Sequence, residues 1–175
     1  MKEIYIFDID GSIMLPLFSN FTRNGSRTGI VKEVIKNGNS VNLYPQFIEF
    51  YEKHCTKAYS VYFITGRKRS EFGDLTEKHL QPLTTIHPFQ IIYYPEGKSN
   101  RIRKYFTWKA KTIKGIIESI SNGKNSNNNS LETFKFHIFD DMNDYFPKVR
   151  KFREKQEIQI QLTLIENKSS WNLLI

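Results

Sequence analysis

The sequence predicts an α/β protein with a mainly parallel sheet of about five strands. Short apolar runs typical of buried strands alternate along the chain with longer segments of helical periodicity. The 175 residues, of which 39% are hydrophobic, are enough to bury a substantial core. Carboxylates follow two of the apolar runs, at the strand ends where α/β sheets bind their ligands. A single domain, residues 1–175, is expected.

The first predicted strand ends in two carboxylates. Ile4 to Phe7 has the character of a buried strand, and Asp8 and Asp10 follow it. Both aspartates point to the same side, because successive strand residues alternate between faces. A divalent cation lets both stay ionised, whereas their repulsion otherwise holds one proton on the pair. Gly11 allows a sharp turn close to a ligand. A helix N-cap is the alternative role for an aspartate here.

The second predicted strand leads into a phosphate-binding motif. Val61 to Ile64 is followed by Thr65, Gly66 and Arg67. A hydroxyl, a backbone N–H and a guanidinium at a strand end form a clamp for a phosphate. Because parallel strands end at one edge of a sheet, the clamp and the carboxylates together predict a phosphoryl site at that edge.

A helix over residues 108–121 is expected to bring a lysine to this site. Thr107 is its expected N-cap. Lys109 has isoleucines four, seven and eight positions later, at helical spacing, and Lys111 lacks this register. Lys109 is therefore the expected catalytic lysine and Lys111 the substitute. An exposed helix lysine with no role in catalysis is the alternative for both.

A second acidic group, Asp140, Asp141 and Asp144, follows a later strand. The site thus draws residues from several strand ends. The full set of expected elements comprises strands near residues 4–9, 60–65, 90–94, 135–140 and 158–165, and helices near 45–55, 70–80, 108–121 and 144–155.

The order of motifs from Tyr5 to Asp144 resembles the haloacid dehalogenase superfamily, in which DxDG, a strand-end Thr or Ser, a helical Lys and a late acidic pair follow one another. The resemblance implies a Rossmann-like three-layer fold with strand order 3-2-1-4-5. It also implies an Mg²⁺-dependent phosphatase with Asp8 as nucleophile, Asp10 as general acid and base, and Thr65 as a phosphate ligand. Such a carboxylate forms an acyl phosphate that water later hydrolyses.

The last motif implies the rest of the metal site. Asp8, Asp10 and Asp141 are the expected Mg²⁺ ligands, with Asp140 beside them and Asp144 as a helix cap or outer neighbour. In the commonest family pattern a small residue stands where this chain has Asp140. The double-aspartate form resembles polynucleotide kinase-phosphatases and a group of predicted RNA-repair phosphatases nicknamed Swiss Army Knife.

Charge favours a polyanionic substrate. The net charge is +8, and the segment 98–114 holds seven basic residues and no acidic one. Basic residues interleaved with aromatic ones are typical of single-strand nucleic-acid binding. Arg101, Arg103 and Lys104 are therefore expected to contact a nucleic-acid end or nucleotide. The alternatives are a solvated loop with core aromatics, a small-molecule or phosphoprotein substrate, and a non-catalytic nucleic-acid-binding module.

The remaining segments suggest an open site in a cytoplasmic protein. Residues 12–42 have room for a flap or small cap but not for a full lid, and residues 121–133 form an Asn/Ser-rich loop expected to be flexible. The single cysteine, Cys55, excludes an intramolecular disulfide and favours a reducing compartment. No signal peptide or membrane span is expected.

Overall fold

A parallel five-stranded sheet forms the centre of the computed structural model, which describes residues 1–14, 43–98, 102–122, 133–156 and 158–175. The predicted fold class and the strand order 3-2-1-4-5 are confirmed. Across the sheet the strands are β3 (Gln90–Tyr93), β2 (Ser60–Thr65), β1 (Lys2–Asp8), β4 (Phe134–Asp140) and β5 (Gln159–Leu164).

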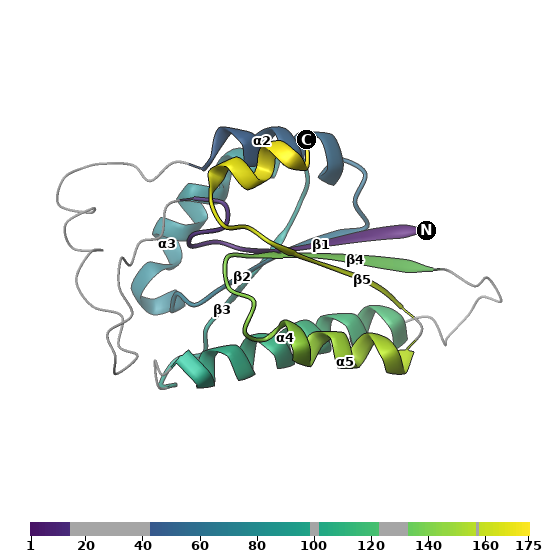
Figure 1. The fold of residues 1–175 in the computed structure, drawn as a ribbon. Coiled ribbons are helices and arrows are strands. Elements are labelled where there is room, and N and C mark those ends of the chain that lie inside the picture. Colours follow the sequence, from purple (N-terminus) through teal and green to yellow (C-terminus); the bar gives the residue numbers. More distant parts are fainter. Residues whose placement is uncertain (15–42, 99–101, 123–132, 157) are drawn as a thin grey trace.

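Helices cover both faces of the sheet, as Figure 1 shows. On one face lie α2 (Pro45–Cys55), α3 (Arg69–Leu80) and the short 3₁₀ helices η1 (Gln81–Thr85) and η3 (Lys168–Leu173). On the other lie α4 (Ile102–Asn122) and α5 (Phe146–Gln156). None of these described helices is long and apolar enough to cross a membrane.

The alternation of side chains along β1 builds two cores. Ile4 and Ile6 pack toward α4 and α5. Tyr5 and Phe7 pack on the opposite face, where Phe7 lies 6.1 Å from Trp171 of η3, measured between ring centroids. Because both faces are buried, Ile4 to Phe7 form an unbroken apolar run within the strand. The alternation also determines on which face the carboxylate at the end of β1 emerges.

One helix begins earlier than the sequence predicts. α4 starts at Ile102, so the prediction that Thr107 caps it is wrong. Thr107 lies inside the helix, where its hydroxyl donates to the carbonyl oxygen of Arg103 over 2.9 Å. The additional turn is stable because Tyr105 and Phe106 bury their rings in the core while Arg103 stays exposed.

Two predicted segments lie largely outside the described residues. These are the flap at residues 12–42, of which only 12–14 are described, and most of the Asn/Ser-rich loop at residues 121–133. The ends of these segments are placed. Ile13 and Met14 are buried against the α2 face of the sheet, and residues 121 and 122 complete α4.

Candidate active site

A buried lysine joins two strand ends at the carboxyl edge of the sheet. Lys109 of α4 forms ion pairs with Asp8 at the end of β1 and with Asp140 at the end of β4. Only 2% of the Lys109 side chain is exposed. Burial alone would lower the pKa of Lys109. The charges of Asp140 and Asp8 together outweigh this effect, so the pKa of Lys109 lies well above the ordinary value. The ammonium therefore stays charged at neutral pH.

Three carboxylates meet around this lysine. Oxygens of Asp8, Asp140 and Asp141 lie within 4.8 Å of one another. Burial raises the pKa of Asp8 to about 7 against the opposing charge of Lys109. Burial, together with the charges of Asp8 and Asp140, raises the pKa of Asp141 to about 8. The three carboxylates are hard oxygen donors, and together they carry more negative charge than one lysine can balance. Such a group fits Mg²⁺.

The loop after β1 fits closely against the end of β4. Gly11 has a φ of +87°, and a Cβ atom at this position would lie 2.3 Å from Oδ2 of Asp141. The backbone N–H of Asp141 donates to Oγ of Ser12 over 2.9 Å. The carbonyl oxygen of Ser12 accepts from the Trp171 indole over 2.8 Å. The position of Asp141 therefore depends on a glycine, a serine and a tryptophan that are distant from it in sequence.

Arg67 forms a second buried pair beside this cluster. Its Nε and Nη2 donate to the two carboxylate oxygens of Asp10 over 3.0 and 2.8 Å. Its Nη1 donates to Oγ1 of Thr76 over 3.0 Å, and its backbone N–H donates to Oγ1 of Thr65 over 3.1 Å. Such a two-point contact holds a carboxylate in one orientation. Arg67 thus positions Asp10, whose carboxylate faces the guanidinium rather than the three-carboxylate cluster.

The structure brings some of the predicted site residues together and places others apart from them. It brings Asp8, Lys109 and Asp141 together, with Asp140 beside them, while the carboxylate of Asp10 pairs with Arg67. Thr65 and Gly66 lie at the same sheet edge, since β2 runs beside β1 with Ile64 opposite Asp8.

The remaining predicted residues lie farther out or are not described. Arg103, Lys104, Lys111 and Asp144 are exposed. Arg101 lies outside the described residues. Tyr105 and Phe106 of the basic segment, and Tyr94 just before it, are buried in the core, as in the alternative interpretation of that segment.

Two tyrosines contact carboxylates of the cluster, and neither was predicted from the sequence as a site residue. The hydroxyl of Tyr105 donates to Oδ1 of Asp8 over 3.3 Å, and that of Tyr145 donates to Oδ2 of Asp140 over 2.6 Å. Tyr105 precedes Lys109 by four residues, and positions four apart share a helix face. That spacing is a signal from which Tyr105 could have been found. Tyr145 has no comparable signal in the sequence.

The strand order, the three layers and the acidic edge define a haloacid dehalogenase-like fold. A solved structure that shares it is the HAD domain of effector protein Lem4 from Legionella pneumophila, with a TM-score of 0.50 and 12% identity. The match covers 93% of this chain and 85% of that chain.

A chain of the Pnkp1/Rnl/Hen1 RNA repair complex also matches, with a TM-score of 0.47 and 14% identity. This match covers 93% of the present chain but 42% of the other, so the present chain spans less than half of its length. No protein-family model matches the sequence, and no curated protein matches it. The likeness at these identities is one of fold.

Proposed function

We propose that the protein is an Mg²⁺-dependent phosphohydrolase that cleaves phosphate monoesters through an aspartyl-phosphate intermediate. The observation that carries this proposal is the grouping of Asp8, Asp140 and Asp141 around Lys109 at the carboxyl edge of a haloacid dehalogenase-like sheet. The three carboxylates would hold Mg²⁺. When bound, the cation supplies positive charge that stabilises the phosphate oxygens as the reaction proceeds.

Asp8 is the proposed nucleophile. Both Lys109 and Tyr105 contact Oδ1 of Asp8, and these contacts orient its carboxylate. Oδ2 attacks phosphorus, a bond forms between them, and the bond from phosphorus to the leaving alcohol breaks. Water then attacks the acyl phosphate, which releases inorganic phosphate and restores the carboxylate.

Asp10 is the proposed general acid and base. Arg67 orients its carboxyl group. In its protonated form Asp10 gives its proton to the leaving alkoxide, and the resulting carboxylate then takes a proton from the attacking water, which returns Asp10 to its starting form. The Thr65 hydroxyl and the Gly66 N–H, at the end of β2, are the proposed phosphate ligands. Lys109 remains protonated throughout and balances the charge of the carboxylates.

A nucleic-acid end or a nucleotide is the proposed substrate. The exposed side chains of Arg103 and Lys104 at the start of α4 support this choice, together with the net charge of +8. A small phosphate monoester or a phosphoprotein is the second candidate, for which the site chemistry is the same. A binding module without catalysis is disfavoured by the buried Lys109 pairs, because such a module needs no charged group there.

Hydrolysis of an aryl phosphate tests the reaction independently of the substrate. We expect activity with Mg²⁺ and none with a chelator. Asp8→Asn should lower turnover by several orders of magnitude while the protein stays folded. Asp74→Asn, which removes an exposed carboxylate from α3, is the matched control and should retain activity. Near wild-type turnover by folded Asp8→Asn protein would exclude the proposed mechanism.

A further inference from the structure

The two faces of α4 carry different chemistry. Lys109 and Tyr105 reach inward to the carboxylates. Helix residues are separated by about 100° each, so Lys111 points almost opposite to Lys109. Arg103 and Lys114 fall on the same outer face as Lys111, and all three are exposed. The outer stripe of cations is therefore not part of the catalytic cluster.

A groove about 660 Å³ in volume lies at the start of this stripe. Basic side chains line it, among them Lys98 and Arg103, and Trp108 forms part of its wall. The Trp108 ring stacks on Tyr105 with 5.7 Å between centroids. Because the Tyr105 hydroxyl contacts Asp8, a single aromatic ring separates the wall of this groove from the proposed nucleophile.

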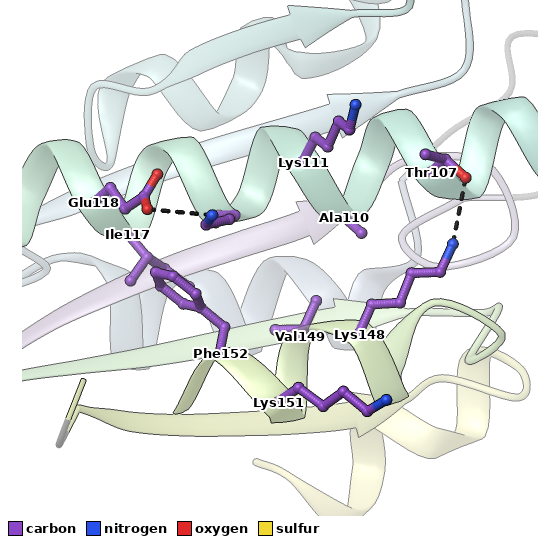
Figure 2. A pocket seen from close by; sticks show the side chains of 10 residues that line it. Thr107, Ala110, Lys111, Ile117, Glu118, Lys148, Val149, Lys151 and Phe152 are labelled. Carbon is purple, nitrogen blue, oxygen red and sulfur yellow. Dashed lines mark hydrogen bonds and ion pairs between the residues drawn. The ribbon is translucent and has the colours of Figure 1, made fainter. Parts of the chain in front are cut away.

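A second groove, about 440 Å³ in volume, lies between α4 and α5. It shares Thr107 and Lys111 with the first, so the two adjoin along the outer face of α4. Figure 2 shows the side chains of Lys148 and Lys151 on the α5 side of this groove.

The floor of the second groove is apolar, and the charge around it is basic. Ala110, Val149 and Phe152 contribute to the floor. The acidic residue in its lining, Glu118, forms an ion pair with Lys114 over 3.4 Å. Phosphates require cations, and this groove provides them. Phe152 is the aromatic ring in its lining, and the Lys114 ammonium lies over that ring at 5.4 Å from the centroid. We define the basic track as the set of cationic side chains lining the two grooves: Lys98, Arg103, Lys104, Lys111, Lys114, Lys148 and Lys151.

We propose that the basic track binds the single-stranded part of a phosphorylated polynucleotide whose end reaches Asp8. The inference rests on the proposed phosphohydrolase function, and it adds the surface that holds the strand and the length that is bound. From Arg103 to Lys114 the helix rises by about 16 Å. At about 3.4 Å per nucleotide, the spacing of a strand whose bases stay stacked as in a duplex, this distance corresponds to about five nucleotides.

Binding to oligonucleotides in the presence of a chelator tests the track without turnover. Fluorescence anisotropy with labelled single strands should show affinity that rises with length and levels off near about five nucleotides. With about five phosphate contacts, affinity should fall about 100-fold between about 50 and 200 mM salt. Affinity that is independent of length would overturn the proposal.

Two variants of equal charge locate the binding. Replacing Lys111, Lys148 and Lys151 together with glutamine should lower the slope of log affinity against log salt by about 2. The matched control replaces Lys57, Lys78 and Lys168, which are exposed and lie outside the lining of both grooves. The control should bind like the wild type. Equal loss in both variants would show that net charge, and not the track, holds the strand.

Other polyanions and the aryl phosphate assay separate the remaining outcomes. A glutamate peptide of equal charge and anionic vesicles should compete for the track less strongly than an oligonucleotide does. If either competes as strongly as the oligonucleotide, the choice of a polynucleotide is overturned. Aryl phosphate hydrolysis without strand binding would refute the track and leave the phosphohydrolase proposal intact. Strand binding without hydrolysis would refute the phosphohydrolase proposal and support the track as a binding site.

Discussion

Replacing Asp8 with asparagine should stabilise the metal-free protein at alkaline pH while abolishing the proposed activity. Asp8 is 5% exposed, and burial raises its pKa from 3.8 to about 7. The folded protein therefore binds this proton more tightly than the unfolded chain does. For a group whose pKa is raised by folding, the stability is fully present below the unfolded value and is lost as pH rises through the folded value. Asparagine has no proton to lose.

The magnitude follows from the pKa of Asp8. Between its unfolded and folded values, each pH unit removes about 1.4 kcal/mol of stability. From about pH 5.5 to the folded value near 7, the wild type therefore loses about 2 kcal/mol that Asp8→Asn keeps. For a chain of this size, 1 kcal/mol corresponds to about 2–4 °C in Tm. The advantage of the variant in Tm should thus grow by about 4–8 °C between about pH 5.5 and pH 8.5.

Thermal unfolding followed by circular dichroism in chelator measures this difference, with Asp74→Asn as the control. Added Mg²⁺ should raise the Tm of the wild type at the higher pH, because the cation replaces the lost proton, and it should raise the Tm of Asp8→Asn less. A Tm advantage that is the same at both pH values would refute the raised pKa. An equal Mg²⁺ response in both proteins would refute Asp8 as a ligand.

Three further substitutions, at two positions, test the geometry around the cluster. Gly11→Ala should remove the Mg²⁺-induced rise in Tm and most aryl phosphate hydrolysis. The added Cβ would lie 2.3 Å from Oδ2 of Asp141, at a φ of +87°. An unchanged Mg²⁺ titration would show that the loop moves to accommodate the Cβ atom. Arg67→Met should destabilise the fold by about 3 kcal/mol in urea unfolding, because it leaves Asp10 without its buried partner. Arg67→Lys should recover only part of this loss, because an ammonium cannot contact both oxygens as a guanidinium does, and full recovery would contradict the two-point contact.

The sequence predicted those parts of the site that are encoded by local periodicity. Alternation along β1 placed Asp8 at a strand end, and helical spacing selected Lys109 over Lys111, which is exposed in the structure. The order of the strands in the sheet was predicted only through the family resemblance, because strands that pair come from segments far apart in the sequence. A local sequence pattern predicts which side chains share one face of a helix or strand. Tertiary packing decides which strands lie next to one another in the sheet.

The parts that were missed depend on long-range contacts. The guanidinium that holds the Asp10 carboxylate lies 57 residues away in the sequence, and no local pattern predicted this pair. Ser12 meets an indole 159 residues away, and nothing in the composition of either segment signals this contact. The N-cap expected at Thr107 failed because buried aromatic rings outweigh the preference of a threonine for a helix start.

The hydrogen bond from Trp171 to Ser12 makes the fluorescence of the protein informative about the carboxyl edge of its sheet. The chain has two tryptophans. Trp171 touches Ser12, which accepts from the backbone of Asp141, and Trp108 stacks on Tyr105, which donates to Asp8. Each indole is thus one residue removed from a carboxylate of the cluster, and the two lie on opposite faces of the sheet. An optical probe of cation or phosphate binding is therefore built into the native chain, and no label is needed to follow either event.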